Sequence, residues 1–255
     1  MPTIESATVP LAKTEFMGLT FDCGPRERWL DEVLSVEKVS PFRFLVTPNA
    51  DHMVRYLEGG IEADVYEAAD YHLCDSRILN LLATRVGKDL QPFPGSDMVR
   101  SVLEAPEAQS LRIAVVGPDA PDMKALETVF PGLKLDHISS APRMQPGDSN
   151  WLSCHQALMT AEFDLLLICF GFPKQEYMAH GLVQAGKDCG LGLCVGASID
   201  FLTGKQKRAP LWMQRMHLEW LHRLASQPRR LGRRYLVDCP RIFRHVRRLE
   251  GHGRQ

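Results

Sequence analysis

The sequence predicts an α/β fold: a Rossmann-like, mainly parallel β-sheet covered by helices on both faces, followed by a basic helical C-terminal appendage. Over the first 200 residues, short apolar runs alternate with segments of helical periodicity. Strands that are apolar along their whole length are typical of a parallel sheet buried on both faces. After residue 204 the charge changes sharply. We therefore expect a Rossmann-like domain at 1–204 and an appendage at 205–255.

Each element of the sheet is predicted from its own segment. Apolar runs predict strands at 42–47, 71–74, 111–117, 133–138, 164–171 and 191–197. Apolar residues at helical spacing predict helices at 50–59, 76–86, 96–103, 121–130, 150–162 and 173–185. Ser96 and Asp97 are suited to cap the helix that they open. Because ligands of such sheets bind outside the carboxyl ends of the strands, we expect the site residues just after the strands.

The composition is that of a soluble globular protein. With 255 residues, 45% apolar and 24% charged, the chain can bury a substantial core, which excludes disordered and collagen-like proteins. No apolar run approaches the roughly 20 residues of a membrane-spanning helix, and the first residues lack the features of a signal peptide. Seven cysteines without a C-x-x-C pair argue against a disulfide framework and a zinc ribbon, so we expect a cytoplasmic protein.

The net charge of −1 conceals two opposed blocks. Residues 205–255 hold 14 Lys and Arg and three acids, whereas residues 1–204 hold 16 basic and 28 acidic groups. This segregation indicates an anionic partner for the appendage: a membrane, nucleic acid or a phosphorylated substrate. Apolar stripes beside these cations favour a membrane interface over nucleic acid, and would also suit a homo-oligomer. The stripes are Met213, Met216, Trp220 and Leu224, then Ile242, Phe243, Val246 and Leu249.

Motifs for cofactors and metals are missing. The sequence has no G-x-x-x-x-G-K-[ST] loop, no G-x-G-x-x-G, no H-E-x-x-H, no G-x-S-x-G and no D-x-D. Its nine histidines show no ligand spacing, so we expect neither a metal site nor a cofactor. Two alternatives remain open at this point: a nucleic-acid-binding protein that uses the basic helices, and a nucleotide-cofactor oxidoreductase, which the missing glycine motif disfavours.

The residues that follow the strands are candidates for chemistry. Asp75 could be a general base if its pKa is raised, or it could cap the helix that begins at Ser76. Segment 170–176 could present backbone amides to a diphosphate, or it could be an ordinary strand-to-helix turn. Thr47 and Asn49 could contact a ligand or form a turn.

Taken in order, these segments resemble the WecG/TagA/CpsF glycosyltransferase family. The longest match is VGASIDFLTGKQKRAP at 195–210. The resemblance covers roughly residues 15–245, so agreement by chance is excluded in practice. Shorter matches are VTPNA at 46–50, AADYHLCD at 68–75, GK at 87–88, PGSD at 94–97, FGFPKQE at 170–176 and several segments between 212 and 236.

The resemblance implies an inverting, metal-independent transferase. Such enzymes move N-acetylmannosamine, its uronic acid or a related hexose from a UDP-sugar to a polyprenyl-diphosphate-linked saccharide in cell-surface polysaccharide synthesis. They would act at the inner face of the cell membrane, with arginines of the appendage closing over the site. The resemblance implies Asp75 as catalytic base. The expected substrate-binding residues are Thr47, Asn49, Gly95, Gly171, Lys174, Gln175, Glu176, Lys207, Arg208, Arg223, Arg230 and Arg233.

One segment departs from the family pattern. The family usually continues after its aspartate with glycine and a small apolar run, whereas here Asp75 is followed by Ser76, Arg77 and Ile78. The added bulk and cation bear on which sugars fit beside Asp75, not on its role. We expect Asp75 to deprotonate the acceptor hydroxyl, while arginines of the appendage stabilise the departing diphosphate.

Overall fold

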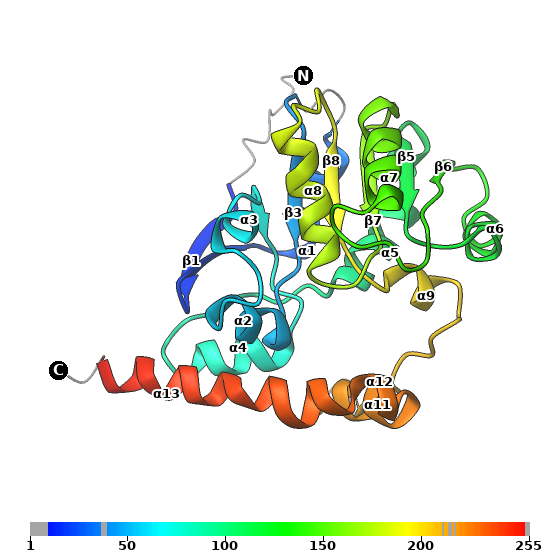
Figure 1. Ribbon diagram of the computed structural model, residues 1–255. Coiled ribbons are helices and arrows are strands. Elements are labelled where there is room, and N and C mark those ends of the chain that lie inside the picture. Colours follow the sequence, from blue (N-terminus) through cyan, green and yellow to red (C-terminus); the bar gives the residue numbers. More distant parts are fainter. Residues whose placement is uncertain (1–9, 37–39, 211, 214–215, 217, 253–255) are drawn as a thin grey trace, which may run out of the picture.

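The computed structural model describes residues 10–36, 40–210, 212–213, 216 and 218–252, apart from the side chains of Arg230 and of 248–252. Its centre is a six-stranded sheet with the order β4-β3-β8-β7-β5-β6 (Figure 1). All neighbouring strands run parallel, which confirms the predicted fold class. The strands are β3 (Arg43–Val46), β4 (Tyr71–His72), β5 (Arg112–Val116), β6 (Lys134–Ile138), β7 (Leu165–Ile168) and β8 (Leu191–Cys194).

Helices cover both faces of the sheet because successive side chains of each strand point to opposite sides. Phe44 and Val46 pack in one apolar cluster and Leu45 in the other. The first cluster contains α2 (Ala50–Leu57), α3 (Ala63–Glu67), α4 (Arg77–Thr84), α7 (Ser149–Thr160) and α8 (Lys174–Gln184). The second contains α1 (Arg26–Leu34), α5 (Gly95–Glu104), η1 (Pro106–Gln109), α6 (Ala120–Val129) and α9 (Ser198–Leu202).

An N-terminal hairpin precedes the sheet and was not predicted. Its antiparallel strands are β1 (Ala12–Phe16) and β2 (Leu19–Cys23). Met17 and Gly18 form the turn with positive φ angles of 57° and 79°. Asn-Gly is the pair from which such a turn is usually predicted, and Met-Gly is not. The buried carboxylate of Asp22 accepts the amide of His72 at 2.9 Å, which ties the hairpin to β4.

Two helix starts near the carboxyl ends of the strands differ from expectation. The hydroxyl of Ser76 accepts the amide of Leu79 at 3.2 Å and caps α4, so the alternative that Asp75 caps this helix is wrong. Helix α5 begins at Gly95 without any side-chain cap, so the expected cap by Ser96 and Asp97 is wrong as well. The amide of Gly95 instead donates to Oδ1 of Asp75 at 2.6 Å.

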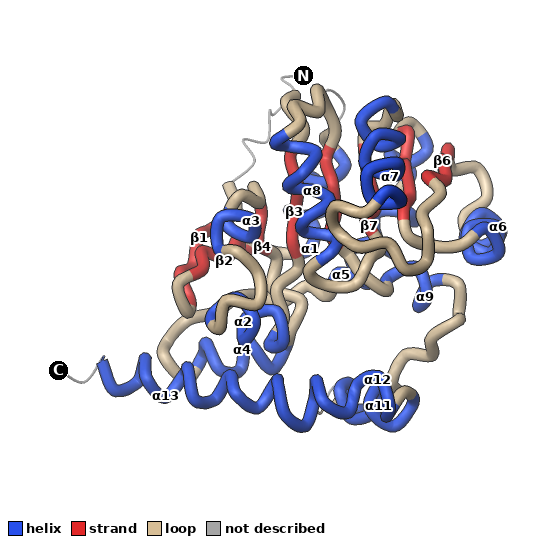
Figure 2. The backbone as a smooth tube through the Cα atoms, viewed as in Figure 1, coloured by secondary structure: helices blue, strands red, loops and turns tan. Residues whose placement is uncertain are grey.

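The appendage runs as a chain of helices along one end of the molecule (Figure 2). Helix α13 lies against α2, and Ile242 and Val246 are buried in the first apolar cluster. The body of the protein, meaning the described residues before 205, therefore covers part of the apolar stripe 242–249 that was expected to face lipid. The side chain of Leu249 lies outside the described part. The elements are α11 (Glu219–Ser226), α12 (Pro228–Arg233), a π-helical turn η2 (Arg234–Asp238), η3 (Cys239–Arg241) and α13 (Ile242–His252).

Exposed large apolar side chains are concentrated in the appendage. Among the described residues there are nine of them, and six belong to the appendage. They are Trp212, Met216, Leu221, Leu236, Val237 and Phe243. Within the described ranges, no helix combines the length and the apolar character that crossing a membrane would require.

Candidate active site

A cavity of about 330 Å³ opens beyond the carboxyl ends of β3 and β4, within the size range of small-molecule sites. Its wall comes from both parts of the chain. The body contributes Asn49, Ala50, Asp51, Asp75, Ser76, Arg77, Ile78, Pro94, Ser96 and Phe201. The appendage contributes Lys207, Arg208, Ala209, Glu219, Trp220, Arg223, Arg234, Tyr235, Cys239, Pro240, Ile242 and Phe243.

Asp75 is the carboxylate that the strand end places in this cavity. Its amide donates to the carbonyl oxygen of Pro48 at 2.9 Å, and its Oδ1 accepts from Gly95. Burial raises the pKa of Asp75 to about 6, against the opposing effects of the Gly95 hydrogen bond and the charges of Arg223 and Arg234. A carboxylate with this pKa is ionised at neutral pH yet basic enough to accept a proton in a reaction.

The cavity wall carries more positive than negative charge. Arg223 lies with its guanidinium 4.7 Å from the ring centre of Phe201. Arg208 is tied to α5 by an ion pair with Asp97 and by a 3.1 Å hydrogen bond to Ser96 Oγ. An excess of cations in a concave site favours an anionic ligand. The charged residues are Arg77, Lys207, Arg208, Arg223 and Arg234, against Asp51, Asp75 and Glu219.

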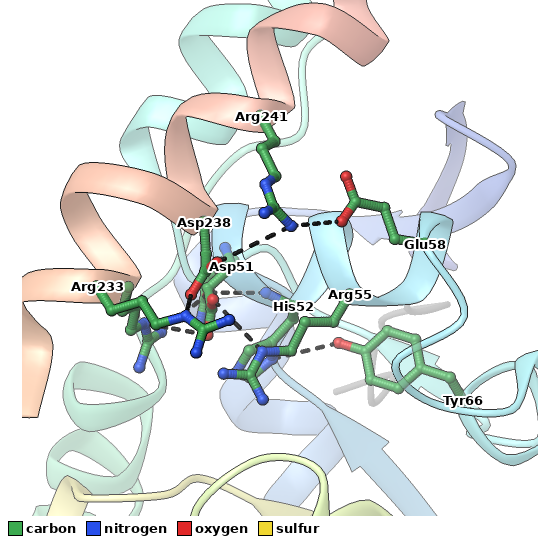
Figure 3. Close-up of polar contacts among 10 residues, drawn as sticks. Asp51, His52, Arg55, Glu58, Tyr66, Arg233, Asp238 and Arg241 are labelled. Atoms are coloured by element: carbon green, nitrogen blue, oxygen red, sulfur yellow. Dashed lines mark hydrogen bonds and ion pairs between the residues drawn. The ribbon is translucent and has the colours of Figure 1, made fainter.

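Polar contacts join α2 to the appendage at the edge of the cavity. Arg234 places Nε 3.1 Å from Oδ2 of Asp51, and its Nη2 donates to Oδ1 of Asn49 at 3.2 Å. The same oxygen of Asn49 caps α2. At the other end of α2, Nη1 of Arg241 donates to Oε2 of Glu58 at 2.9 Å. Figure 3 shows Asp51 on α2, and Glu58 directly after this helix, facing the appendage.

The segment 170–176 does not line the cavity. Gln175 and Glu176 are buried inside the body: Gln175 Oε1 accepts the amide of Gly196 at 2.8 Å, and its Nε2 donates to Glu176 at 2.9 Å. Lys174 donates to the carbonyl oxygen of Met144 at 2.7 Å. None of these three, nor Gly171, lines the cavity. The segment therefore braces the ends of β7 and β8.

Thr47 is also outside the cavity wall. It is 5% exposed, and its hydroxyl donates to the carbonyl oxygen of Cys194 at 2.9 Å. A Cβ added to Gly95 would come within 3.3 Å of Thr47 Cγ2, so the glycine allows α5 to approach β3. This approach brings the Gly95 amide to Asp75. Among the described residues, no group of three or more His, Cys, Asp or Glu side chains is placed to hold a metal ion.

Comparisons with known proteins identify the family of the chain. A family model described as "Glycosyl transferase WecG/TagA/CpsF family" matches residues 14–254. The chain belongs to the WecG/TagA/CpsF glycosyltransferase family. This membership confirms the predicted enzyme class and favours a transferase over the nucleic-acid-binding and oxidoreductase alternatives.

Two curated relatives carry the same name, N-acetylglucosaminyldiphosphoundecaprenol N-acetyl-beta-D-mannosaminyltransferase. The protein from Bacillus spizizenii is 26% identical over 212 residues, which cover 81% of this chain and 79% of the relative. The protein from Bacillus subtilis (strain 168) is 26% identical over 176 residues, which cover 67% of this chain and 66% of the relative.

The structure brings together only part of the residue set expected from the WecG/TagA/CpsF resemblance. The cavity unites Asp75 with Asn49, Lys207, Arg208 and Arg223. The side chain of Arg233 is 85% exposed, with Nε 3.9 Å from Asp238, and does not line the cavity. The side chain of Arg230 lies outside the described residues.

Four residues that line the cavity were not expected as site residues from the sequence: Asp51, Trp220, Arg234 and Tyr235. The signal for Arg234 was present, because it directly follows Arg233 in a basic run. The helix changes from α to π at Arg234. Because of this change, the 3.6-residue periodicity of α12 could not predict which of the two arginines lines the cavity.

Proposed function

We propose that this glycosyltransferase moves N-acetylmannosamine, its uronic acid or a related hexose from a UDP-sugar to a polyprenyl-diphosphate-linked saccharide, with inversion and without a metal ion. The names of the two relatives support this class of sugar and acceptor. The observation that carries the proposal is the carboxylate of Asp75, with its raised pKa, in a cavity dominated by cations.

The proposed reaction is a single displacement. Asp75 takes the proton of the acceptor hydroxyl, and the hydroxyl oxygen forms a bond to the anomeric carbon from the face opposite UDP. The bond between that carbon and the diphosphate oxygen breaks, and its electron pair leaves with UDP, so the configuration inverts. Arg223 and Lys207, which line the cavity, stabilise the negative charge that develops on the diphosphate.

The appendage would hold the enzyme at the cytoplasmic face of the membrane, where a polyprenyl-linked acceptor is found. Residues 205–255 carry a net charge of +11, and each cation near an anionic surface contributes about 1 kcal/mol. Trp212, Met216 and Phe243 are exposed and suit the interface. Binding to the membrane is tested by flotation with anionic and with neutral vesicles. An oligonucleotide shift assay tests whether the appendage binds nucleic acid instead. Sedimentation without lipid tests whether the same side chains join two copies of the chain.

Replacing the base tests the function. We expect Asp75→Asn to lower transfer from UDP-sugars to a short-chain polyprenyl-diphosphate acceptor by about 10²- to 10⁴-fold, with UDP binding largely unchanged. Asp188→Asn is the matched control, because Asp188 is 82% exposed and precedes β8, at the amino ends of the strands rather than the carboxyl ends. Turnover retained in Asp75→Asn would remove Asp75 from the mechanism. A panel of UDP-sugars in the same assay would identify the donor.

A further inference from the structure

Asp51 is a buried carboxylate that two arginines share. Its side chain is 3% exposed and lies 3.1 Å from Arg234 Nε and 3.5 Å from Arg55 Nε. A buried carboxylate is stable only when cations or hydrogen-bond donors compensate its charge. Here one negative charge stands between two guanidinium groups. The group of Asp51, Arg55 and Arg234 therefore keeps a net positive charge even though its ion pairs are formed.

Arg234 is held by protein partners on one side and lines the cavity on the other. The side chain is 28% exposed. Its Nε forms the ion pair with Asp51 and its Nη2 donates to Asn49, and the side chain also forms a hydrogen bond with Cys239, whereas a guanidinium has five N–H donors. The remaining donors can bind a ligand in a fixed fork, the geometry that suits phosphate oxygens.

Other arginines near the cavity are placed differently. Arg208 is paired with Asp97 and bonded to Ser96, but the side chain of Asp97 is 17% exposed, against 3% for Asp51. Arg233 is almost fully exposed. Arg234 is therefore distinguished among them by a buried counter-ion that fixes its orientation and by donors left for a ligand.

We infer that Arg234 binds the diphosphate of the nucleotide-sugar donor, and that Asp51 is the positioning residue that holds Arg234 in place. This inference rests on the proposed function, because it assumes that the anion in the cavity is the diphosphate of a UDP-sugar. As the bond to the anomeric carbon breaks, Arg234 stabilises the charge that appears on the β-phosphate.

Removing the guanidinium tests the first half. Losing a charge-assisted hydrogen bond should weaken UDP binding to Arg234→Gln by about tenfold to a hundredfold, measured by isothermal titration calorimetry. The charge of Arg234 lowers the pKa of Asp75, so the acidic limb of the pH–rate profile should move to higher pH. Arg229→Gln, an exposed arginine in α12, should change neither. Arg234→Lys should keep the acidic limb but not the UDP affinity, since it retains charge without the fork.

A double-variant cycle tests the second half. Asp51→Asn keeps the shape of the side chain but removes the counter-ion, so UDP binding should weaken by about tenfold. If Asp51 acts through Arg234, adding Asp51→Asn to Arg234→Gln should weaken UDP binding no further. A purely structural role for Asp51 would add its own penalty in both backgrounds. Circular dichroism confirms that each variant is folded.

The outcomes separate this inference from the proposed function. If Arg234→Gln binds UDP as tightly as the wild type while Asp75→Asn is inactive, the role of Arg234 is overturned and the function stands. Additive effects of the two substitutions overturn the positioning role of Asp51. If the unmodified enzyme neither binds UDP nor transfers sugar from it, both proposals fall together.

Discussion

The body and the appendage are stabilised in different ways. Two apolar clusters, one on each face of the sheet, pack the body. The appendage contacts α2 through two buried side chains, Ile242 and Val246, flanked by the ion pairs of Arg234 and Arg241. It also carries most of the exposed apolar side chains among the described residues. Most of the apolar core thus lies in the body, and the described part of the appendage adds Ile242 and Val246 to one of its clusters.

This difference matters because the cavity is built from both parts. The body supplies the carboxylate of Asp75, whereas the appendage supplies Lys207, Arg223 and Arg234. A base and the cations that stabilise a leaving group need opposite environments. The base needs partial burial to raise its pKa, and the cations repel one another unless carboxylates or a bound anion lie between them. Because the base comes from the body and most of the cations come from the appendage, substitutions in the appendage can change activity without changing the folding of the body.

Removing the appendage should have the largest effect. A chain that lacks residues 205–255 should lose all transfer to a lipid-linked acceptor, because four of the five cations that line the cavity are gone. It should also be more soluble, because exposed side chains such as Trp212, Met216 and Leu236 are removed. Transfer assays, sedimentation and thermal unfolding of the same preparation check this. Full activity of the shortened chain would contradict the division of roles between the two parts.

Besides its effect on transfer, replacing Asp75 should have an intermediate effect on stability. Its pKa rises from 3.8 to about 6 in the folded protein, so the folded state binds this proton more tightly than the unfolded chain. Keeping the carboxylate charged therefore costs stability above about pH 6, and this cost fades as the pH falls toward 3.8. Asp75→Asn should raise the free energy of unfolding by about 1–3 kcal/mol near pH 8, with no gain near pH 4.

Denaturant unfolding at both pH values measures this shift, with Asp188→Asn as the exposed control. An equal gain at the two pH values would mean that the substitution acts through packing. A stabilised but inactive Asp75→Asn would instead show that the body tolerates an unfavourable charge at this position for the sake of catalysis.

The ion pair at the outer edge of the interface should show the smallest effect. Arg241 and Glu58 are 2.9 Å apart, but their side chains remain 40% and 33% exposed. Exposed pairs of this kind contribute about 0–1 kcal/mol, so Arg241→Gln should shift the free energy of unfolding by less than about 1 kcal/mol and change transfer by less than about twofold. A large loss of activity would show that ion pairs, rather than Ile242 and Val246, hold the appendage in place.

Local patterns predicted the elements of the sheet but not every detail around them. The most apolar runs fall on the inner strands β5, β7 and β8, because a strand buried on both faces of a parallel sheet needs apolar residues at nearly every position. The hairpin before residue 24 escaped prediction because its Met-Gly turn carries no strong signal. The segment 170–176 was expected at the ligand, yet Gln175 and Glu176 turn inward.

The amino-acid sequence alone was enough for the α/β architecture, for the separation of charge between 1–204 and 205–255, and for placing Asp75 after a strand. These are properties of neighbouring residues, and short-range periodicity and composition record them. The folded chain was needed to show that Ser76 caps α4, that Gly95 bonds to Asp75, and that Arg234 rather than Arg233 enters the cavity. Such choices depend on contacts between distant segments: Asn49 and Arg234 meet across 185 positions of the chain, and no local pattern encodes that encounter.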